Sequence, residues 1–284
     1  MQFAACAQMT RDNVILRTRP SSHKTTRIHC NHFVELWGDR PVSEINRLEV
    51  QAWATQRKQD RSESTVQREL SFLRQVFKTA TSLQLEHQYP TVDLGIRLKK
   101  GKRHQWLTYE AQPILMAAYA ALLPHWELHW SIADFVLLSG LRRGEQLHLR
   151  PHHLSEQFIV VPEEGKTGTR LVPMHPRAWN IAQMWIRKAA ELGSEFVFWP
   201  EASRDRLKYG ELYAQKYWVP TVKAAGMAGL QMRDMRRSYA CRLVDMDVSI
   251  LEIRDLLGHS SVEQTLTYCQ VQPHKLRSAV LRLC

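Results

Sequence analysis

Apolar residues recur at spacings of three and four along much of the first ninety residues, a pattern typical of amphipathic helices. It predicts one helix over 24–37, a second that begins at Asn46 and a third that begins at Ser64. Their apolar faces comprise, in chain order, Ile28, Phe33, Val34 and Trp37; Leu48, Ala52 and Trp53; and Val66, Leu70, Leu73, Val76, Phe77 and Ala80. Asn46 and Glu49 have the spacing of a capping box, which strengthens the second helix. Residues 1–22 lack this periodicity and are predicted to form a flexible tail.

The chain becomes more apolar after Trp106, and the pattern there is mixed. Helices are predicted from Thr108 to about Leu122 and over 126–139, and two more within 176–225, around a short apolar run at 196–199. Short β-like runs at 158–162 and 169–174, joined by a glycine-rich stretch, predict a β-hairpin. Three short helices should follow: 233–244, 250–257 and one capped by Ser260 or Ser261 that carries Val262, Leu266 and Tyr268. The expected fold class is mainly α with a small β-hairpin.

These patterns divide the chain into four parts. We expect a tail at 1–22, a helical domain at 23–90, a basic linker at 91–105 and a larger second domain at 106–284; 284 residues are enough for two domains of ordinary size. Within the linker, Arg97–Arg103 reads RLKKGKR, with five basic residues of seven. Such a segment repels itself and stays extended.

Charge indicates a polyanionic partner. The net charge is +11, and residues 1–104 hold 18 Lys and Arg against 10 Asp and Glu. A basic region suits nucleic acid, because each phosphate that it neutralises releases condensed counterions. An anionic membrane surface or solubility alone are the other interpretations. On the third helix the polar face carries Gln67, Arg68, Arg74 and Lys78, which is either solvated or a DNA-contacting face.

Several classes of site and location are disfavoured. No uninterrupted apolar stretch reaches the length of a membrane span, and residues 1–19 lack the layout of a signal peptide, so we expect a cytoplasmic protein. The five cysteines are scattered, without a CxxC pair, which indicates neither disulfides nor zinc. His125 and His129 flank Glu127, but the Glu is not next to the first His as in a zincin. No metal is expected.

Two segments carry the candidate chemistry. Residues 139–151 read SGLRRGEQLHLRP, in which a glycine turn places Arg142 at the start of a helix, where the positive end of the helix dipole suits an anion. Residues 232–270 contain Arg233, Arg236, His259 and Tyr268 within an otherwise amphipathic helical stretch. Gly258 is the expected left-handed stop of the helix before His259.

Together these motifs resemble the tyrosine recombinase (phage integrase) family. Arg142 and Glu145 match the arginine and the acidic support of its first motif, with Ser139 in place of the common Thr. Lys166, in KTGTRLVPM, resembles the lysine of the family's hairpin. The family's second arginine, the His or Trp after Leu-Gly and the tyrosine nine residues later correspond to Arg236, His259 and Tyr268.

This resemblance implies a helical core-binding domain followed by a mixed α/β catalytic domain. The implied function is that of a site-specific DNA recombinase or integrase of a mobile genetic element, which cuts and rejoins strands through a covalent 3′-phosphotyrosine without metal or cofactor. Arg142 and Arg236 would hold the phosphate, Tyr268 would attack it, Lys166 would act as general acid and His259 would bind the phosphate. Expected partners are double-stranded DNA, contacted by Arg68, Arg74, Lys78, Arg97, Lys99, Lys100, Lys102 and Arg103, and a homotetramer on paired sites. The tetramer would form through the C-terminal stripe Leu276, Val280, Leu281 and Leu283, for which packing on its own domain is the alternative.

One position departs from the family pattern. Arg233 occupies the place of the usual histidine, and arginine stays protonated in proteins, so it cannot accept the tyrosine proton. We interpret Arg233 as an electrostatic helper. The alternative function is a DNA-binding protein of the same fold with reduced or no catalysis. A type IB topoisomerase is disfavoured by the short chain and the recombinase-like motifs.

Overall fold

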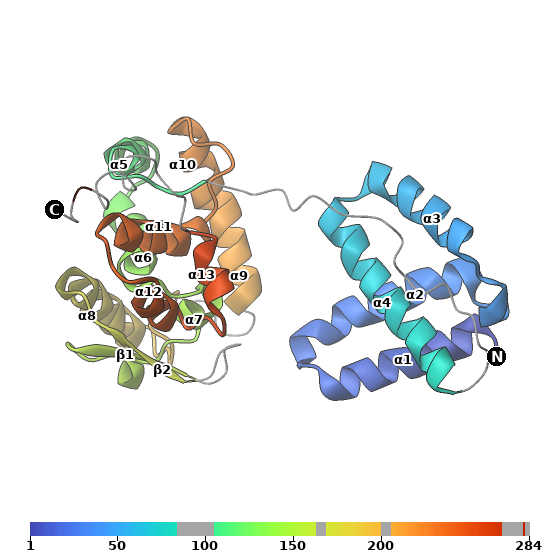
Figure 1. Cartoon of the computed structure of the whole chain (residues 1–284). Helices are drawn as coiled ribbons and strands as arrows, with labels where there is room; N and C mark the ends of the chain where they lie inside the picture. The colour runs from blue at the N-terminus through green and yellow to red at the C-terminus, as the bar shows by residue number, and fades with distance from the viewer. Residues whose placement is uncertain (84–104, 163–168, 200–205, 269–280, 282–284) are drawn as a thin grey trace. The chain divides into compact units, whose positions relative to one another are not determined.

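The computed structural model describes residues 1–83, 105–162, 169–199, 206–268 and 281. The chain divides into two compact units, Met1–Arg103 and His104–Cys284, and Figure 1 labels the elements of each. The catalytic domain expected at 106–284 corresponds to the second of these units. The strap 97–103, the hairpin lysine Lys166 and most of the C-terminal stripe lie outside the described residues.

The first unit consists of helices packed around an aromatic core. In chain order they are α1 (Phe3–Arg17), α2 (Pro20–Trp37), the 3-10 turn η1 (Val42–Glu44), α3 (Arg47–Asp60) and α4 (Glu63–Ser82). Helix α4 packs against each of the other three helices, and α1 also packs along α2. The ring of Phe33 stacks on Trp37 at 5.6 Å and on Phe72 at 6.4 Å. Residues from α2 and α4 therefore meet in this core.

Residues 1–22 form α1 and the beginning of α2, so the predicted flexible tail is wrong. The buried residues of α1 are Phe3, Cys6, Ala7 and Thr10, which follow each other at helical spacing. Phe3 packs edge-on against Trp37 at 5.8 Å, and the Thr10 hydroxyl donates to the Cys6 carbonyl at 2.8 Å. This face is built largely from small or weakly apolar residues, so it does not stand out as a hydrophobic stripe.

The start of α3 confirms one prediction and corrects another. The Asn46 side chain accepts from the Glu49 amide at 3.0 Å, and the Glu49 carboxylate accepts from the Asn46 amide at 3.1 Å, so the capping box is present. The predicted apolar face was only partly right: Trp53 packs against the core, but Leu48 is 76% exposed, and Val50 and Ala54 are the buried residues of the helix. Positions 50 and 54 are one helical turn apart and form the buried face of α3.

The predicted core face of α4 is confirmed, but its beginning was misplaced. Its six predicted apolar residues are buried. Ser62 rather than Ser64 caps the helix, with its hydroxyl accepting from the Thr65 amide at 3.4 Å. Glu69 is buried among them, and Arg57 donates to both of its carboxylate oxygens at 3.0 and 2.9 Å. A buried carboxylate needs such a partner to remain charged.

The second unit is arranged around α6 (Trp126–Ser139), which packs against α5 (Ala111–Leu122), α8 (Pro176–Glu191) and α11 (Asp234–Asp245) (Figure 1). The remaining elements, in chain order, are α7 (Arg143–Leu147), the 3-10 turn η2 (Pro151–His153), β1 (Phe158–Val161), β2 (Arg170–Pro173), α9 (Arg206–Tyr213), the π-helical turn η3 (Ala214–Trp218), α10 (Val219–Ala224), α12 (Ile250–Leu257) and α13 (Val262–Leu266).

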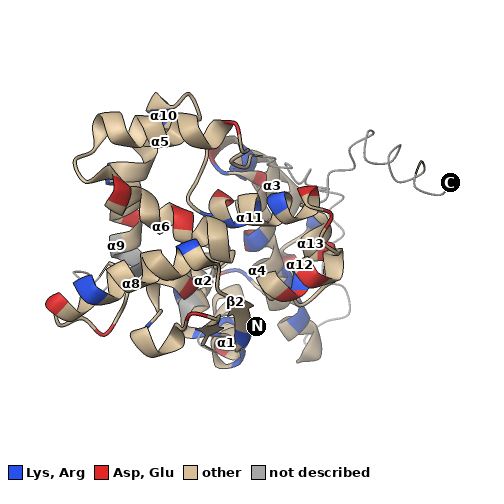
Figure 2. Ribbon diagram, turned by 90° about the vertical axis from the view of Figure 1, so that its left-hand side faces the viewer, with Lys and Arg blue, Asp and Glu red and all other residues tan. Residues whose placement is uncertain are grey.

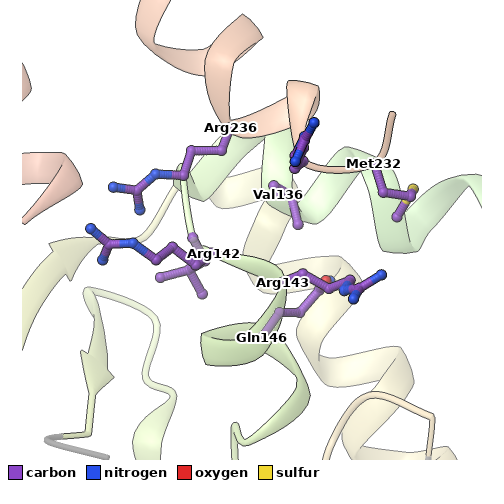
Figure 3. Close-up of a pocket in the computed structure, with 8 residues that line it drawn as sticks. Val136, Arg142, Arg143, Gln146, Met232 and Arg236 are labelled. Atoms are coloured by element: carbon purple, nitrogen blue, oxygen red, sulfur yellow. The ribbon is translucent and has the colours of Figure 1, made fainter. Parts of the chain in front are cut away.

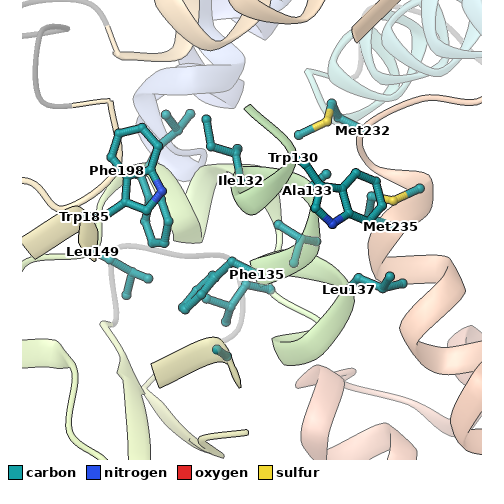
Figure 4. Packing of buried hydrophobic residues seen from close by; sticks show 14 of the residues in the cluster. Trp130, Ile132, Ala133, Phe135, Leu137, Leu149, Trp185, Phe198, Met232 and Met235 are labelled. Carbon is teal, nitrogen blue, oxygen red and sulfur yellow. The ribbon is translucent and has the colours of Figure 1, made fainter. Parts of the chain in front are cut away.

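Helix α6 is buried as predicted and supplies the centre of the core. Figure 4 shows Trp130 on the side of Met232 and Met235, and Phe135 among residues that include Leu149. The rings of Phe135 and Phe198 are 4.6 Å apart, and Phe198 lies 5.8 Å from Trp185 of α8. This packing fixes the end of α6, after which the chain turns toward the candidate site.

The hairpin consists of β1 and β2 paired antiparallel, with Val161 opposite Arg170 and Ile159 opposite Val172. Ile159, Val161 and Val172 are buried. The predicted hairpin is therefore confirmed, and one of its faces lies in the core. Its connecting residues, 163–168, lie outside the described part of the chain.

Element boundaries in this unit were predicted with mixed success. The bounds of α6 and α12 are those predicted. Thr108 was predicted to cap α5; its hydroxyl accepts from the Ala111 amide at 3.2 Å, but the helix begins at Ala111 and its N-cap residue is Glu110. Helix α13 ends at Leu266, so Tyr268 lies in the turn after the helix and not on it. The turn, and not the helical period of α13, therefore sets the direction of the Tyr268 side chain.

Histidines in this unit bond to their neighbours in the fold. His129 Nδ1 lies 2.7 Å from the Tyr213 hydroxyl, and His148 Nδ1 lies 2.6 Å from the Gly144 carbonyl oxygen. Among the described residues, no group of His, Cys, Asp and Glu side chains is arranged to hold a metal ion.

Helix α5 is uncharged along its length and appears tan throughout in Figure 2, whereas α11 carries both charge signs. Its exposed apolar residues include Ile114 and Leu122. Even so, neither α5 nor any other helix in the described ranges combines the length and apolar character needed to span a membrane.

Candidate active site

Arg142 is presented by a sharp turn between α6 and α7. Gly140 ends α6 with a φ of 65°, in the left-handed region that favours glycine. A Cβ at this position would also lie 2.5 Å from the ring of Tyr239, so the close approach of α11 requires glycine for a second reason. Two residues later, the Arg142 backbone enters α7 in an extended conformation. The turn therefore holds the base of the Arg142 side chain in one place.

Glu145 is the acidic centre of the site. It is only 6% exposed, and its two oxygens accept from the Arg142 amide at 2.8 Å and from Arg142 Nη1 at 2.7 Å. Arg170 of β2 donates to both oxygens as well, at 2.9 and 2.8 Å. Burial alone would raise the pKa of Glu145, but the bonds and charge of Arg170 and the bonds of Arg142 lower it to about 2. The carboxylate is therefore ionised at neutral pH.

Arg236, in the first turn of α11, is held by two backbone carbonyls at helix ends. Its Nη1 donates to the Gly140 carbonyl at 2.8 Å and its Nη2 to the Leu257 carbonyl at 2.6 Å. The side chain is almost fully buried, and Nη1 also lies 3.8 Å from Glu145 Oε2. Burial, followed by the charge of Arg142, lowers the pKa of Arg236 to about 10, so the group still carries its proton at pH 7.

Positive charge exceeds negative charge at this point. Among the described residues, Glu145 is the carboxylate that contacts the guanidinium groups of Arg142, Arg170 and Arg236. Figure 3 shows the guanidinium groups of Arg142 and Arg236 extending in the same direction, away from Arg143. Arg142, Arg170 and Arg236 thus share one carboxylate. The guanidinium groups of Arg142 and Arg236 can therefore neutralise an added anion, and the geometry of a phosphate suits such a pair.

His259 lies next to this cluster, after the turn at Gly258. Gly258 has a φ of 62° at the end of α12, which confirms the predicted left-handed stop. The imidazole Nδ1 lies 2.8 Å from the hydroxyl oxygen of Thr265. Burial, then the charges of Arg236, Arg142 and Arg170, lower the pKa of His259 to about 4. The ring is therefore neutral at pH 7, and it can hydrogen-bond an anion without adding charge.

Tyr268 is placed beside His259 by the turn that follows α13. The two rings are stacked, with centroids 5.9 Å apart and planes inclined by 23°. The guanidinium carbon of Arg237 lies 5.4 Å from the Tyr268 ring centroid, and Arg237 also donates to the Thr267 carbonyl at 3.1 Å. The Tyr268 backbone amide donates to the Thr265 carbonyl at 2.9 Å. The predicted nucleophile is thus within the same constellation as His259.

Arg233 is exposed at the residue that precedes α11. Together with Arg142, Arg143 and Arg236 it lines a pocket of about 90 Å³, whose lining also includes Gln146 and Met232 (Figure 3). The structure therefore brings six of the predicted residues to one region: Arg142, Glu145, Arg233, Arg236, His259 and Tyr268. Lys166 lies outside the described residues.

Three of the eight predicted DNA-contacting residues lie within the described part of the chain. Arg68 and Lys78 are exposed on α4, and Arg74 is partly exposed there. The other five, Arg97, Lys99, Lys100, Lys102 and Arg103, lie outside the described ranges.

Sequence reasoning missed Arg170 and Thr265. Arg170 lies two residues before buried Val172 in β2, so both side chains point to the inward face of the strand. An arginine at an inward strand position indicates a buried acidic partner. Thr265 lies one turn inside α13 and is fully buried. A polar residue at the buried position of a short helix likewise indicates a specific hydrogen bond.

Comparison with known proteins identifies the relatives of this chain. A family model described as the phage integrase family matches residues 105–275. The integrase of Salmonella phage P22 is 24% identical over 220 residues, which cover 73% of this chain and 54% of that protein. The chain therefore spans about half the length of this curated relative.

Solved structures share the fold over nearly the whole chain. The Tn1549 transposon integrase in complex with transposon right end DNA superposes with a TM-score of 0.81 at 16% identity, covering 100% of this chain and 99% of that one. A lambda integrase tetramer bound to a Holliday junction gives a TM-score of 0.73 at 17% identity, covering 96% of this chain and 80% of that one.

Proposed function

This chain belongs to the phage integrase family, and from that premise we propose that it is a site-specific DNA recombinase that cuts and rejoins strands through a covalent 3′-phosphotyrosine. The observation that carries the proposal is the cluster of Arg142, Arg170 and Arg236 around Glu145, with His259 and Tyr268 beside it. This cluster has an excess of positive charge next to a nucleophile. The substrate that fits is a phosphodiester of double-stranded DNA.

In the proposed reaction, Arg142 and Arg236 hold the non-bridging oxygens of the phosphate. Each terminal nitrogen of a guanidinium group carries two hydrogens. The bonds of Arg236 to the Gly140 and Leu257 carbonyls use one hydrogen on each terminal nitrogen and leave the second for the phosphate. Charge that grows on the oxygens in the transition state is then met by groups already in position.

Tyr268 supplies the nucleophile. Its phenolic proton passes to the surrounding water, and its oxygen forms a bond to phosphorus as the bond from phosphorus to the 5′ oxygen breaks. Lys166 gives a proton to the departing oxygen. Because the phosphotyrosine retains the bond energy, rejoining needs no nucleotide cofactor. His259 hydrogen-bonds the phosphate as a neutral ring, and Arg233 contributes positive charge rather than proton acceptance.

DNA contact and assembly extend the same proposal. Arg68, Arg74 and Lys78 on α4, together with the basic linker, contact the phosphate backbone. The lambda integrase of the same fold forms a tetramer on a Holliday junction, which supports a homotetramer on paired sites for this chain. The segment after Tyr268 is the proposed link between neighbouring subunits.

A covalent-trapping assay tests the function. The full chain is incubated with a nicked suicide DNA substrate that carries the flanking sequence of its own genetic element, and attachment is followed on denaturing gels. Native protein should become attached, whereas Tyr268→Phe should not, with DNA affinity unchanged within about twofold. Arg142→Ala and Arg236→Ala should each slow attachment roughly a hundredfold, the scale for losing a preorganised charge at an oxyanion.

Tyr239→Phe is the matched control. Tyr239 lies on the same helix as Arg236 and is partly buried against Gly140. Removal of its hydroxyl should leave attachment intact. If Tyr268→Phe still becomes attached and Tyr239→Phe does not, the nucleophile is Tyr239. If the native protein binds its site but never becomes attached, the chain is a DNA-binding protein of this fold and the proposed reaction is wrong.

A further inference from the structure

The side chain of Arg170 contacts three separate parts of the candidate active site. Its terminal nitrogens donate to both oxygens of Glu145, on α7. Its Nε donates to the Leu256 carbonyl at 3.4 Å, near the end of α12. Its aliphatic part passes beneath Gly258, the residue that precedes His259. One side chain from the hairpin thus links the turn of Arg142 to the turn of His259.

The contact at Gly258 is close enough to exclude any other residue there. A Cβ on Gly258 would lie 2.7 Å from the Cδ atom of Arg170, and the φ of +62° already disfavours other residues. The Arg170 side chain therefore occupies the space that a side chain at position 258 would need. Displacement of Arg170 would remove the support beneath the turn that carries His259.

Glu145 makes Arg142 dependent on Arg170. The same oxygen, Oε1, accepts from Arg142 Nη1 at 2.7 Å and from Arg170 Nη1 at 2.9 Å, while Oε2 accepts from the Arg142 amide and from Arg170 Nη2. The carboxylate can satisfy both arginines only in one orientation. Bidentate bonds to Arg170 hold it in that orientation. Arg170 consequently aligns Arg142 through the carboxylate that both residues bond.

Burial indicates that Arg170 acts through these neighbours rather than on DNA. Only 9% of its side chain is exposed, compared with 29% for Arg142. Its Nε and both terminal nitrogens already donate to protein acceptors. The residue also lies four positions after Lys166 in the chain, at the start of β2.

We propose that Arg170 is a positioning residue for DNA cleavage, which aligns Arg142 through Glu145 and supports the turn of His259 through Gly258. The proposal rests on the proposed function and adds a residue to it. A loss of alignment by about one ångström is enough to slow an enzymatic step roughly a hundredfold. Substitution of Arg170 should therefore slow the chemical step and leave DNA affinity nearly unchanged.

The test compares Arg170→Gln and Arg170→Lys in the full chain. In single-turnover attachment to the suicide substrate, Gln should slow the rate about a hundredfold, and Lys, which keeps the charge but not the bidentate pair, about tenfold. DNA affinity, measured by fluorescence anisotropy, should change less than about twofold. Arg177→Lys is the control, because it weakens another arginine bond to a buried carboxylate, Asp134, outside the site, and should leave the rate unchanged.

A double variant separates alignment from general loss of structure. If Arg170 acts through Glu145, Arg170→Gln combined with Glu145→Gln should be no slower than the slower single variant, because the two changes break one connection. The double variant also removes one positive and one negative charge, so the net charge of the site stays as in the native protein, unlike in either single variant. Losses that multiply, or a drop in DNA affinity equal to the drop in rate, would overturn the proposal.

A readout without DNA distinguishes this proposal from the proposed function. In nitrogen-15 NMR spectra of the full chain, the guanidinium N–H signals of Arg142 should be protected from exchange in the native protein and in Arg177→Lys. They should be lost in Arg170→Gln. If the native chain never becomes attached to DNA, the proposed function fails, and these signals still decide the role of Arg170. Protected Arg142 signals in Arg170→Gln would show that Arg142 is aligned without it.

Discussion

The Nδ1 atom of His259 lies 2.8 Å from the hydroxyl oxygen of Thr265, which is fully buried in α13. The same helix turn places Tyr268, because the Tyr268 amide donates to the Thr265 carbonyl. Thr265 therefore connects the imidazole and Tyr268, the proposed nucleophile. A hydrogen bond at Nδ1 also determines which tautomer the neutral ring adopts, and thus whether Nε2 presents a hydrogen to the phosphate.

We expect Thr265→Val to slow single-turnover attachment to DNA about tenfold, the scale of one neutral hydrogen bond. Valine has a similar shape but leaves Nδ1 without its partner, whereas Thr265→Ser keeps the hydroxyl and should restore most of the rate. Nitrogen-15 shifts of the His259 ring should show a changed tautomer in the Val variant only. Thr267→Val, at an exposed threonine two residues later, is the control. Equal rates for Val and native protein would remove Thr265 from the mechanism.

Glu145 should make the stability of the protein depend on acid pH. Its pKa in the folded protein is about 2, against an ordinary value of 4.5, so its stabilising contribution is complete above about pH 4.5 and is lost as the pH falls toward 2. The shift corresponds to roughly 3 kcal/mol of unfolding free energy. In Glu145→Gln that contribution should be missing at pH 7, and the free energy of unfolding should depend less on pH between pH 4.5 and 2.

Denaturant unfolding at a series of pH values measures this effect. Glu156→Gln is the control, because it makes the same substitution at an exposed glutamate of the same unit. The free energy of unfolding of this variant should depend on pH as in the native protein. A Glu145→Gln protein with the native slope below pH 4.5 would mean that another carboxylate carries the acid sensitivity.

The sequence predicted elements well where strong apolar residues follow a helical period. The bounds of α6 and α12 and the core face of α4 were obtained in this way. Helix α1 was missed because its buried face includes Cys6, Ala7 and Thr10, which hydropathy does not separate from a polar surface. The face of α3 was partly misassigned because Leu48, the most apolar choice, points into solvent.

The residues of the candidate site were easier to predict than the contacts that join them. Arg142, Arg236, His259 and Tyr268 carry recognisable spacing along the chain, and the structure places them together. Arg170 carries no such spacing, since its importance lies in a contact with Glu145 across 25 residues of sequence. That contact depends on the register of the hairpin against α7, which a local pattern does not contain.

The basic linker provides a test of DNA contact. Neutralising Lys99, Lys100 and Lys102 together with Gln in the full chain should flatten the slope of log affinity against log salt concentration by roughly two to three units, about one for each lost phosphate contact. The measurement is DNA affinity over a range of salt concentrations. As a control, Lys188→Gln and Arg187→Gln on α8 remove positive charge outside the predicted contacts and should leave the slope as it is. An unchanged slope in the triple variant would place the linker away from DNA.

Arg233 stands where the family usually has histidine, and its exposed position beside the arginine-lined pocket indicates a role through charge. Arg233→Lys should therefore retain much of the cleavage rate and Arg233→Ala should lose it. Arg233→His introduces a group with an ordinary pKa near 6.5, so its rate should vary with pH between about 5.5 and 7.5. The native protein should lack that variation, because the depressed pKa of His259, about 4, lies below this range. The measurement is the single-turnover attachment rate of the four proteins against pH. A titration of the native rate near pH 6.5 would identify His259 as the base, with its pKa raised by bound phosphate. An Arg233→Ala protein as fast as the native one would exclude position 233 from the reaction.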